Sequence, residues 1–238
     1  MSVRTKILIM CGGRGKRLGD LTEDIPKPLV KINDKTILEN KIYQYQSQGF
    51  NDYIFCIGYK GEMIKTLIDQ KTNISAHYSD AGLDAGILFR LNHAKDLFED
   101  SVLMTYGDTY TDLELNALIK THNNSDNEAT IVVSPIQNPF GLVEFDKNNQ
   151  VTYFKEKPIL NYYIGYAIIN KSSLDILPEC LVNLPDGQGL VEFYKNLQQK
   201  NLLGCYYHSG LEATFNTKEE LASAKNKMNR FYTAIVEN

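Results

Sequence analysis

Apolar and polar positions in residues 1–128 follow two alternating patterns. Short, mostly apolar runs are typical of strands buried in a parallel sheet, and longer stretches with apolar side chains on one helical face are typical of amphipathic helices. The predicted strands are residues 7–10, 53–58, 74–78 (an outer strand, because polar and apolar positions alternate) and 102–106, and the predicted helices are residues 36–48, 62–69 and 85–98. This alternation predicts a parallel α/β sheet with right-handed crossovers.

The pattern changes after residue 128. Residues 131–133 and 165–169 are again short apolar strands, whereas Lys147-Asn148-Asn149 separates two strand-like segments and predicts a β-hairpin. The hairpin strands are residues 141–146 and 151–156, and further helices are predicted over residues 190–199 and 218–231. No linker or internal repeat separates the two halves, so we predict a single Rossmann-like domain over residues 1–238, with a mixed, mainly parallel sheet flanked by helices.

A loop rich in glycine and in cations follows the first predicted strand. Residues 12–17, GGRGKR, hold three glycines and three cations within six positions. Glycines let successive backbone N–H groups turn toward one point and form an anion-binding nest, and the cations can neutralise a polyphosphate. Pro26-Lys27-Pro28 then fixes one more lysine on a stiff segment. The sequence therefore predicts a phosphate-binding loop after the first strand.

Two common phosphate-binding motifs do not fit this loop. A P-loop requires GxxxxGK[ST], but Met10 stands where its first glycine should be and Arg17 follows Lys16. A dinucleotide fingerprint requires GxGxxG, but Leu18 occupies its last position. Both of these nucleotide-binding classes are excluded on spacing.

Composition and charge mainly exclude certain kinds of partner and location. The formal charge of −4 argues against a nucleic-acid partner or an anionic membrane, and no apolar run approaches the roughly 18 residues of a membrane span. Residues 1–6 lack the apolar core of a signal peptide. The four cysteines form no CxxC pair and the four histidines show no zinc-ligand spacing, which favours reduced thiols in a cytoplasmic protein.

Four segments together resemble a known family. GGxGxRL followed by PKP, then YGD at residues 106–108, EKP at residues 156–158 and a late segment that ends in Asn216-Thr217 are similar to motifs of the nucleotidyltransferases that couple a nucleoside triphosphate to a sugar phosphate. The resemblance covers nearly the whole chain and is nearest to the glucose-1-phosphate cytidylyltransferases. It implies a GT-A-like fold, with a nucleotide-binding half over residues 1–128 and an acceptor-binding β lobe over residues 129–238.

The resemblance also implies roles for particular residues. Arg17 and Lys27 match the catalytic cations, and Asp108 and Asn216 match the Mg²⁺ ligands. A carboxylate at the carboxyl end of a parallel strand is well placed for Mg²⁺ bound to phosphate. Asn216 stands where the family has an aspartate, so the metal site should be weaker. The implied nucleotide contacts are Cys11, Gly12, Gly13, Arg14, Gly15, Lys16, Asp80, Ala85, Gly86, Tyr106 and Gly107, and the implied acceptor contacts are Gly141, Glu156, Lys157 and Tyr163.

Some of these assignments have competing interpretations. Arg14 and Lys16 fit solvent-exposed cations equally well, and the aromatic residues around Tyr163 fit core packing. Residues 80–86 fall where the family reads the base, and backbone groups with one carboxylate could select cytosine there. Asp108-Thr109-Tyr110 is not the DxD of a glycosyltransferase.

The leading hypothesis is an Mg²⁺-dependent cytidylyltransferase, expected as a homo-oligomer, that makes a CDP-linked product for capsule or lipopolysaccharide synthesis. Its acceptor would be glucose 1-phosphate, another sugar 1-phosphate, or a non-sugar such as phosphoglutamine. One alternative is a guanylyl or uridylyl transferase acting on a heptose or hexose 1-phosphate. Another is a nucleotide-binding regulator without catalysis, which Asn216 motivates.

Overall fold

The computed structural model describes residues 5–185 and 187–223. The strands of its central sheet are β1 (Lys6–Met10), β4 (Asp52–Ile57), β5 (Ser75–Asp80), β6 (Ser101–Tyr106), β8 (Ala129–Gln137), β11 (Ile159–Asn170) and β12 (Leu203–Tyr207). Their order is β12-β8-β11-β6-β1-β4-β5. Only the two pairings of β11 in this sheet are antiparallel. The predicted mixed, mainly parallel sheet is confirmed, with β5 at its edge.

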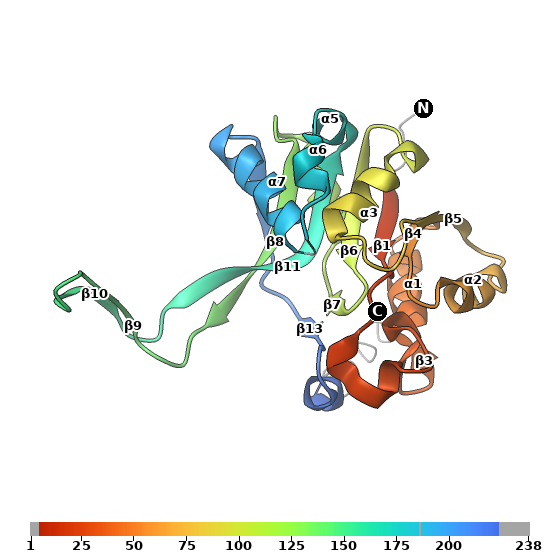
Figure 1. Ribbon diagram of the computed structural model, residues 1–238, viewed down its shortest axis with the longest axis horizontal. Helices are drawn as coiled ribbons and strands as arrows, with labels where there is room; N and C mark the ends of the chain where they lie inside the picture. The colour runs from red at the N-terminus through yellow and green to blue at the C-terminus, as the bar shows by residue number, and fades with distance from the viewer. Residues whose placement is uncertain (1–4, 186, 224–238) are drawn as a thin grey trace.

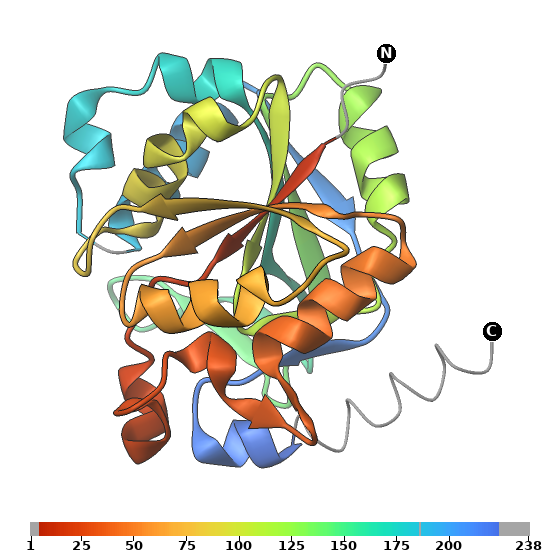
Figure 2. The same ribbon diagram turned by 90° about the vertical axis from the view of Figure 1, so that its right-hand side faces the viewer.

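Helices cover both faces of the sheet (Figure 2). In β1, Ile7 and Ile9 pack on one face and Leu8 packs on the other, because successive side chains of a strand point in opposite directions. The first face is covered by α1 (Ile37–Ser47), α2 (Gly61–Asp69) and α4 (Leu115–Asn123), and the second by α3 (Ile87–His93), α5 (Lys171–Asp175), α6 (Glu179–Val182) and α7 (Gln188–Gln199). Within the described ranges, no helix has the length and apolar character to cross a bilayer.

Most predicted elements are confirmed to within a few residues, and three differ in extent. The strand predicted over residues 165–169 begins earlier, at Ile159, and the strand predicted over residues 131–133 is part of the longer β8. The helix predicted over residues 85–98 is shorter, because Gly86 is extended and the chain leaves the helix at Ala94. Residues 218–223 are helical as predicted, and the rest of that predicted helix lies outside the described residues.

A hairpin arm projects from the ends of β8 and β11 (Figure 1). It consists of β9 (Leu142–Phe145) and β10 (Val151–Lys155), which pair antiparallel as predicted, with Asn149 in the left-handed conformation at φ 62°. All residues of β10 are exposed. The arm therefore stands apart from the body of the protein.

Two short strands that the sequence pattern did not predict lie outside the central sheet. β7 (Thr109–Thr111) follows β6 after a two-residue turn and pairs antiparallel with β13 (Glu212–Thr214). Each is only three residues long and contains two polar residues, so no apolar run marks them. Their pairing brings the end of the described chain next to the carboxyl end of β6.

Candidate active site

A cavity of about 620 Å³ opens at the carboxyl ends of β1 and β6. This volume is within the range of small-molecule sites, which is about 300–1,000 Å³. Its charged lining consists of five cations and two carboxylates: Arg14, Lys16, Arg17, Lys27, Arg90, Asp84 and Asp108. The excess of positive charge favours a polyanionic ligand.

The glycine loop forms one wall of the cavity. Gly15 adopts the left-handed conformation at φ 64°, which glycine enters without steric cost, and its carbonyl accepts a hydrogen bond of 3.1 Å from the Thr22 hydroxyl. The N–H groups of residues 12–15 donate no hydrogen bond within the described part of the chain. Unpaired N–H groups beside a cavity are available to an anion, as expected for a phosphate-binding nest.

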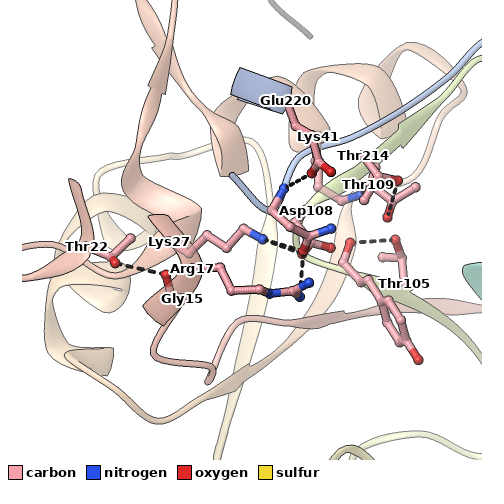
Figure 3. Close-up of polar contacts among 12 residues, drawn as sticks. Gly15, Arg17, Thr22, Lys27, Lys41, Thr105, Asp108, Thr109, Thr214 and Glu220 are labelled. Carbon is pink, nitrogen blue, oxygen red and sulfur yellow. Dashed lines mark hydrogen bonds and ion pairs between the residues drawn. The ribbon is translucent and has the colours of Figure 1, made fainter. Parts of the chain in front are cut away.

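The cationic side chains of Arg17 and Lys27 lie beside this loop with the Asp108 carboxylate (Figure 3), and both contact the side-chain oxygen of Asn216. Lys27 Nζ lies 2.6 Å from Asp108 Oδ2 and 3.3 Å from Asn216 Oδ1. Arg17 Nη2 donates to the same Asn216 oxygen at 2.8 Å. The four residues that the sequence singled out for catalysis and metal binding are therefore in contact with one another.

The β7–β13 pairing brings Asp108 and Asn216 together. Thr109 pairs with Thr214, and their hydroxyls are joined by a hydrogen bond of 3.2 Å. Asp108 precedes β7 and Asn216 follows β13, so the two side chains emerge at the same end of this small ladder. The Asn216 N–H also donates to the Glu220 carboxylate at 2.6 Å, which fixes its backbone.

Side chains of helix α1 hold β7, the strand that follows Asp108, by hydrogen bonds. Lys41 is fully buried, and its ammonium donates to the Thr109 carbonyl and, at 3.0 Å, to the Tyr166 hydroxyl. One helical turn later, the buried Gln44 donates to the Thr111 carbonyl. Two polar side chains of α1 thus hold the carbonyls of the first and last residues of β7, and the Tyr166 hydroxyl also donates to the first of these at 3.0 Å.

Asp108 and Asn216 are the residues of the site that could hold a metal ion. Asp108 and Asn216 direct one carboxylate oxygen and one amide oxygen at a single cationic atom, Lys27 Nζ. No group of three or more metal-ligating acidic, histidine or cysteine side chains occurs in the described residues. Mg²⁺ commonly binds through one or two carboxylates and completes its shell with substrate phosphates and water. The pair fits such an ion.

Other predicted nucleotide contacts also line the cavity. Arg14 lies over the Tyr59 ring, 5.4 Å from its centre, so its guanidinium is partly held by a cation–π contact. Cys11 is buried, and burial raises the pKa of its thiol far above the usual range, so this thiol stays protonated and is no nucleophile. Gly12, Gly13, Lys16, Ala85, Tyr106 and Gly107 complete the predicted residues at the cavity.

Two nucleotide contacts predicted in the 80–86 segment lie outside the cavity lining. The Asp80 carboxylate accepts a hydrogen bond from the Gly82 N–H at 2.9 Å and closes a local turn. Gly86 caps the start of α3. Asp84, between them, lines the cavity and was not singled out from the sequence.

The predicted acceptor contacts also lie outside the cavity lining. Gly141, Glu156 and Lys157 are exposed and lie together at the base of the hairpin arm, where Leu142 of β9 pairs with Lys155 of β10. Tyr163 packs edge-on against Tyr106, which does line the cavity, with ring centres 5.9 Å apart. Burial beside other tyrosines raises the pKa of Tyr163 well above its usual value, so its hydroxyl stays neutral.

Arg90 is the cavity residue that sequence reasoning missed most plainly. It is only 5% exposed and belongs to α3, where Leu88 and Leu91 face the core. The sequence did contain a signal: Arg90 is a single cation on the apolar face of an amphipathic helix. Hydrophobic periodicity counts only the apolar positions and therefore does not detect it.

Comparison with known proteins identifies the class. A family model described as nucleotidyl transferase matches residues 6–172. The chain belongs to this family and is a sugar-phosphate nucleotidyltransferase, as its sequence motifs predicted.

Individual relatives differ in the names they carry. The chain is 30% identical to a probable glucose-1-phosphate cytidylyltransferase of Bacillus subtilis, covering 94% of this chain and 95% of that one. It is 31% identical to a D-glycero-alpha-D-manno-heptose 1-phosphate guanylyltransferase of Campylobacter jejuni, over 63% of this chain and 67% of the relative. The crystal structure of HddC from Yersinia pseudotuberculosis matches with a TM-score of 0.72 at 21% identity, covering 94% of this chain and all of that one. This last likeness supports the fold.

Proposed function

We propose that this protein is a cytidylyltransferase that transfers CMP from CTP to a phosphorylated acceptor and releases pyrophosphate. The observation that carries the proposal is the contact of Arg17 and Lys27 with Asp108 and Asn216 beside a glycine loop whose N–H groups are unpaired. The name of the Bacillus subtilis relative supports cytidine as the base. We assign the CDP-linked product to cell-surface polysaccharide synthesis.

The chemistry requires positioning and neutralisation of charge. An oxygen of the acceptor phosphate attacks the α-phosphorus of CTP, and the bond from this phosphorus to the oxygen bridging to the β-phosphate breaks, so pyrophosphate leaves. The acceptor phosphate is already anionic, so no strong general base is needed. Arg17 suits a bidentate contact with phosphate oxygens, and Lys27 acts as a point charge. Both would stabilise the negative charge of the transition state.

Asp108 and Asn216 would hold Mg²⁺. When bound, the ion neutralises phosphate charge and orients the triphosphate. Asp108 has a second role that needs no metal: its carboxylate keeps the Lys27 ammonium at the cavity wall, with the Lys27 side chain only 13% exposed. The lysine is therefore in place before the nucleotide arrives.

The base would lie against residues 83–85. Cytosine presents an N4 amino donor beside its N3 and O2 acceptors. Asp84 lines the cavity and offers a carboxylate to the amino group, whereas Asp80 is occupied by its own turn. We therefore assign base selection to Asp84 and the neighbouring backbone rather than to Asp80.

The acceptor would approach from the second half of the chain. We keep Gly141, Glu156, Lys157 and Tyr163 as its proposed contacts, with glucose 1-phosphate, another sugar 1-phosphate or phosphoglutamine as candidate acceptors. A homo-oligomer acting in the cytoplasm is part of the proposal. The alternative is a guanylyl transferase on a heptose 1-phosphate, which the name of the Campylobacter jejuni relative favours, or a uridylyl transferase on a hexose 1-phosphate.

The test is pyrophosphate release with Mg²⁺, each of the four nucleoside triphosphates and a panel of these acceptors. Release with CTP alone among the nucleotides supports the proposal, and release with GTP or UTP alone supports the corresponding alternative. CTP binding without release from any pair would indicate a regulator instead of an enzyme.

Lys27→Ala tests the assigned mechanism directly. We expect kcat to fall by about 100-fold or more, as for removal of a group that stabilises transition-state charge, with little change in Tm. Lys31→Ala removes an exposed lysine four positions further along and is the matched control. Normal turnover in Lys27→Ala would contradict the role given to this residue.

A further inference from the structure

Arg90 occupies an unusual position for a buried cation. Its guanidinium donates to carbonyl oxygens of three segments, and no ion pair joins it to a carboxylate within the described residues. The contacts are Ile57 O at 2.7 Å, Gly82 O at 2.7 Å, Ala85 O at 3.0 Å, Leu83 O at 3.4 Å and Gly12 O at 3.5 Å. A buried charge held only by carbonyls is costly to maintain, so its retention calls for a specific role.

Among the carbonyls that Arg90 binds are those of two segments that line the cavity. Gly12 begins the glycine loop, whereas Gly82, Leu83 and Ala85 belong to the segment assigned to the base. No backbone hydrogen bond joins these two segments directly in the described part of the chain. Arg90 is therefore a bridge that connects them.

Gly12 and Gly58 leave the space that the Arg90 guanidinium occupies. A Cβ on Gly12 would lie 2.2 Å from Arg90 Nη1, and a Cβ on Gly58 would lie 2.8 Å from the same atom. The Gly58 position is also 2.9 Å from Gly12 O and 3.0 Å from Gly82 O. Three segments thus converge on the guanidinium at distances that only glycine permits, which leaves little freedom in how the loop and the base segment are spaced.

We propose that Arg90 is a positioning residue that sets the spacing between the phosphate loop and the base-binding segment, so that a nucleoside triphosphate can engage both at once. This inference rests on the proposed function, because it assumes a nucleotide that spans the two segments. A ligand that touches only the phosphate loop, such as pyrophosphate, does not depend on this spacing. Loss of Arg90 should therefore weaken CTP binding selectively.

The experiment measures dissociation constants of CTP and of pyrophosphate by calorimetry for the wild type, Arg90→Met and Arg90→Lys. Losing the hydrogen bonds between CTP and one misplaced segment should cost about 10- to 100-fold in affinity. For Arg90→Met we therefore expect CTP binding to weaken by about 10- to 100-fold, while pyrophosphate binding changes by less than about threefold. Arg90→Lys keeps the charge and loses the planar fork, and we expect it to behave like Arg90→Met because one ammonium cannot reach all three segments.

Leu91→Ala is the matched control. Leu91 is buried on the same helix, and its side chain has no polar group that could hold either segment. Even if Leu91→Ala lowers Tm as much as the Arg90 variants do, it should leave the ratio of the CTP and pyrophosphate dissociation constants at its wild-type value. Equal weakening of both ligands in the Arg90 variants, or the same ratio as in Leu91→Ala, would overturn the inference. Failure of the proposed function would appear in the wild type itself, which would then bind no nucleoside triphosphate, and the inference would fall with it.

Discussion

Asn216→Asp should strengthen Mg²⁺ binding and so lower the Mg²⁺ concentration at which the enzyme is half saturated. The substitution puts a second carboxylate where Asn216 now directs an uncharged oxygen at Lys27 Nζ, 3.3 Å away, opposite Asp108. Hard cations such as Mg²⁺ prefer anionic oxygen ligands, and two carboxylates bind them better than one. The side chains are nearly the same size, so the geometry of the β7–β13 ladder should be preserved.

The magnitude follows from the charges already present. Two unit charges about 4 Å apart interact by about 4 kcal/mol at an effective dielectric constant of about 20. Two effects reduce this gain. The Asp108 side chain is 22% exposed, so solvent screens the site, and a carboxylate at residue 216 would also attract Arg17, now 2.8 Å from the amide oxygen. We expect a net gain of at least about 1.4 kcal/mol, which is tenfold in affinity.

The assay is initial velocity of pyrophosphate release against free Mg²⁺ at saturating CTP and acceptor. The half-saturating Mg²⁺ concentration should fall about tenfold or more in Asn216→Asp and rise in Asn216→Ala. Asn148→Asp adds the same charge at the exposed turn of the hairpin arm and should change nothing. An unchanged Mg²⁺ requirement in both Asn216 variants would refute the assignment of residue 216 as a metal ligand.

Two further predictions concern α1. Lys41→Met removes the ammonium that donates to the Thr109 carbonyl and to the Tyr166 hydroxyl. The Tyr166 hydroxyl still donates to that carbonyl at 3.0 Å, so the loss of hydrogen bonds from a charged donor should cost about 1.5–3 kcal/mol. The value of kcat should fall more than CTP affinity, and a lowered Tm with normal kcat would contradict a role in placing Asp108. Burial alone would raise the pKa of Glu39, but hydrogen bonds from Thr36 together with the neighbouring Lys71 outweigh burial and lower that pKa. Glu39 therefore stabilises the fold above its unfolded pKa and loses this effect as pH falls through its folded pKa. Thermal unfolding of Glu39→Gln should therefore approach the wild type in acid, and a difference that stays constant down to pH 3 would disagree.

The centre of the sheet could be predicted because β1, β4 and β6 are buried on both faces. Residues such as Ile7, Leu8 and Ile9 form an uninterrupted apolar run for this reason. The small ladder of β7 and β13 could not be predicted, since Thr109 and Thr214 carry no apolar signal and their pairing spans 105 residues. Local pattern gives the elements, and pairings at such long range become visible only in the folded chain.

The candidate site divides in the same way. The glycine loop, Lys27 and Asp108 could be predicted because each belongs to a short motif whose chemistry is local. Arg90 and Lys41 could not, because their partners are backbone carbonyls far away in the sequence, and any residue type can supply a carbonyl. The hairpin was predicted correctly, but its projection from the body of the protein depends on the length of β8 and β11, which the short apolar runs underestimate.

The two unpredicted cations act by the same physical means. Arg90 holds the loop and the base segment, and Lys41 holds the strand that begins after Asp108. Each is buried, and neither forms an ion pair with a carboxylate in the described ranges. A carboxylate partner would fix the backbone no better and would cancel the charge, whereas carbonyls satisfy the donors and leave the charge in place. A site that must attract a triphosphate and a second phosphate gains from this arrangement, because the groups that make it rigid also add to its positive potential.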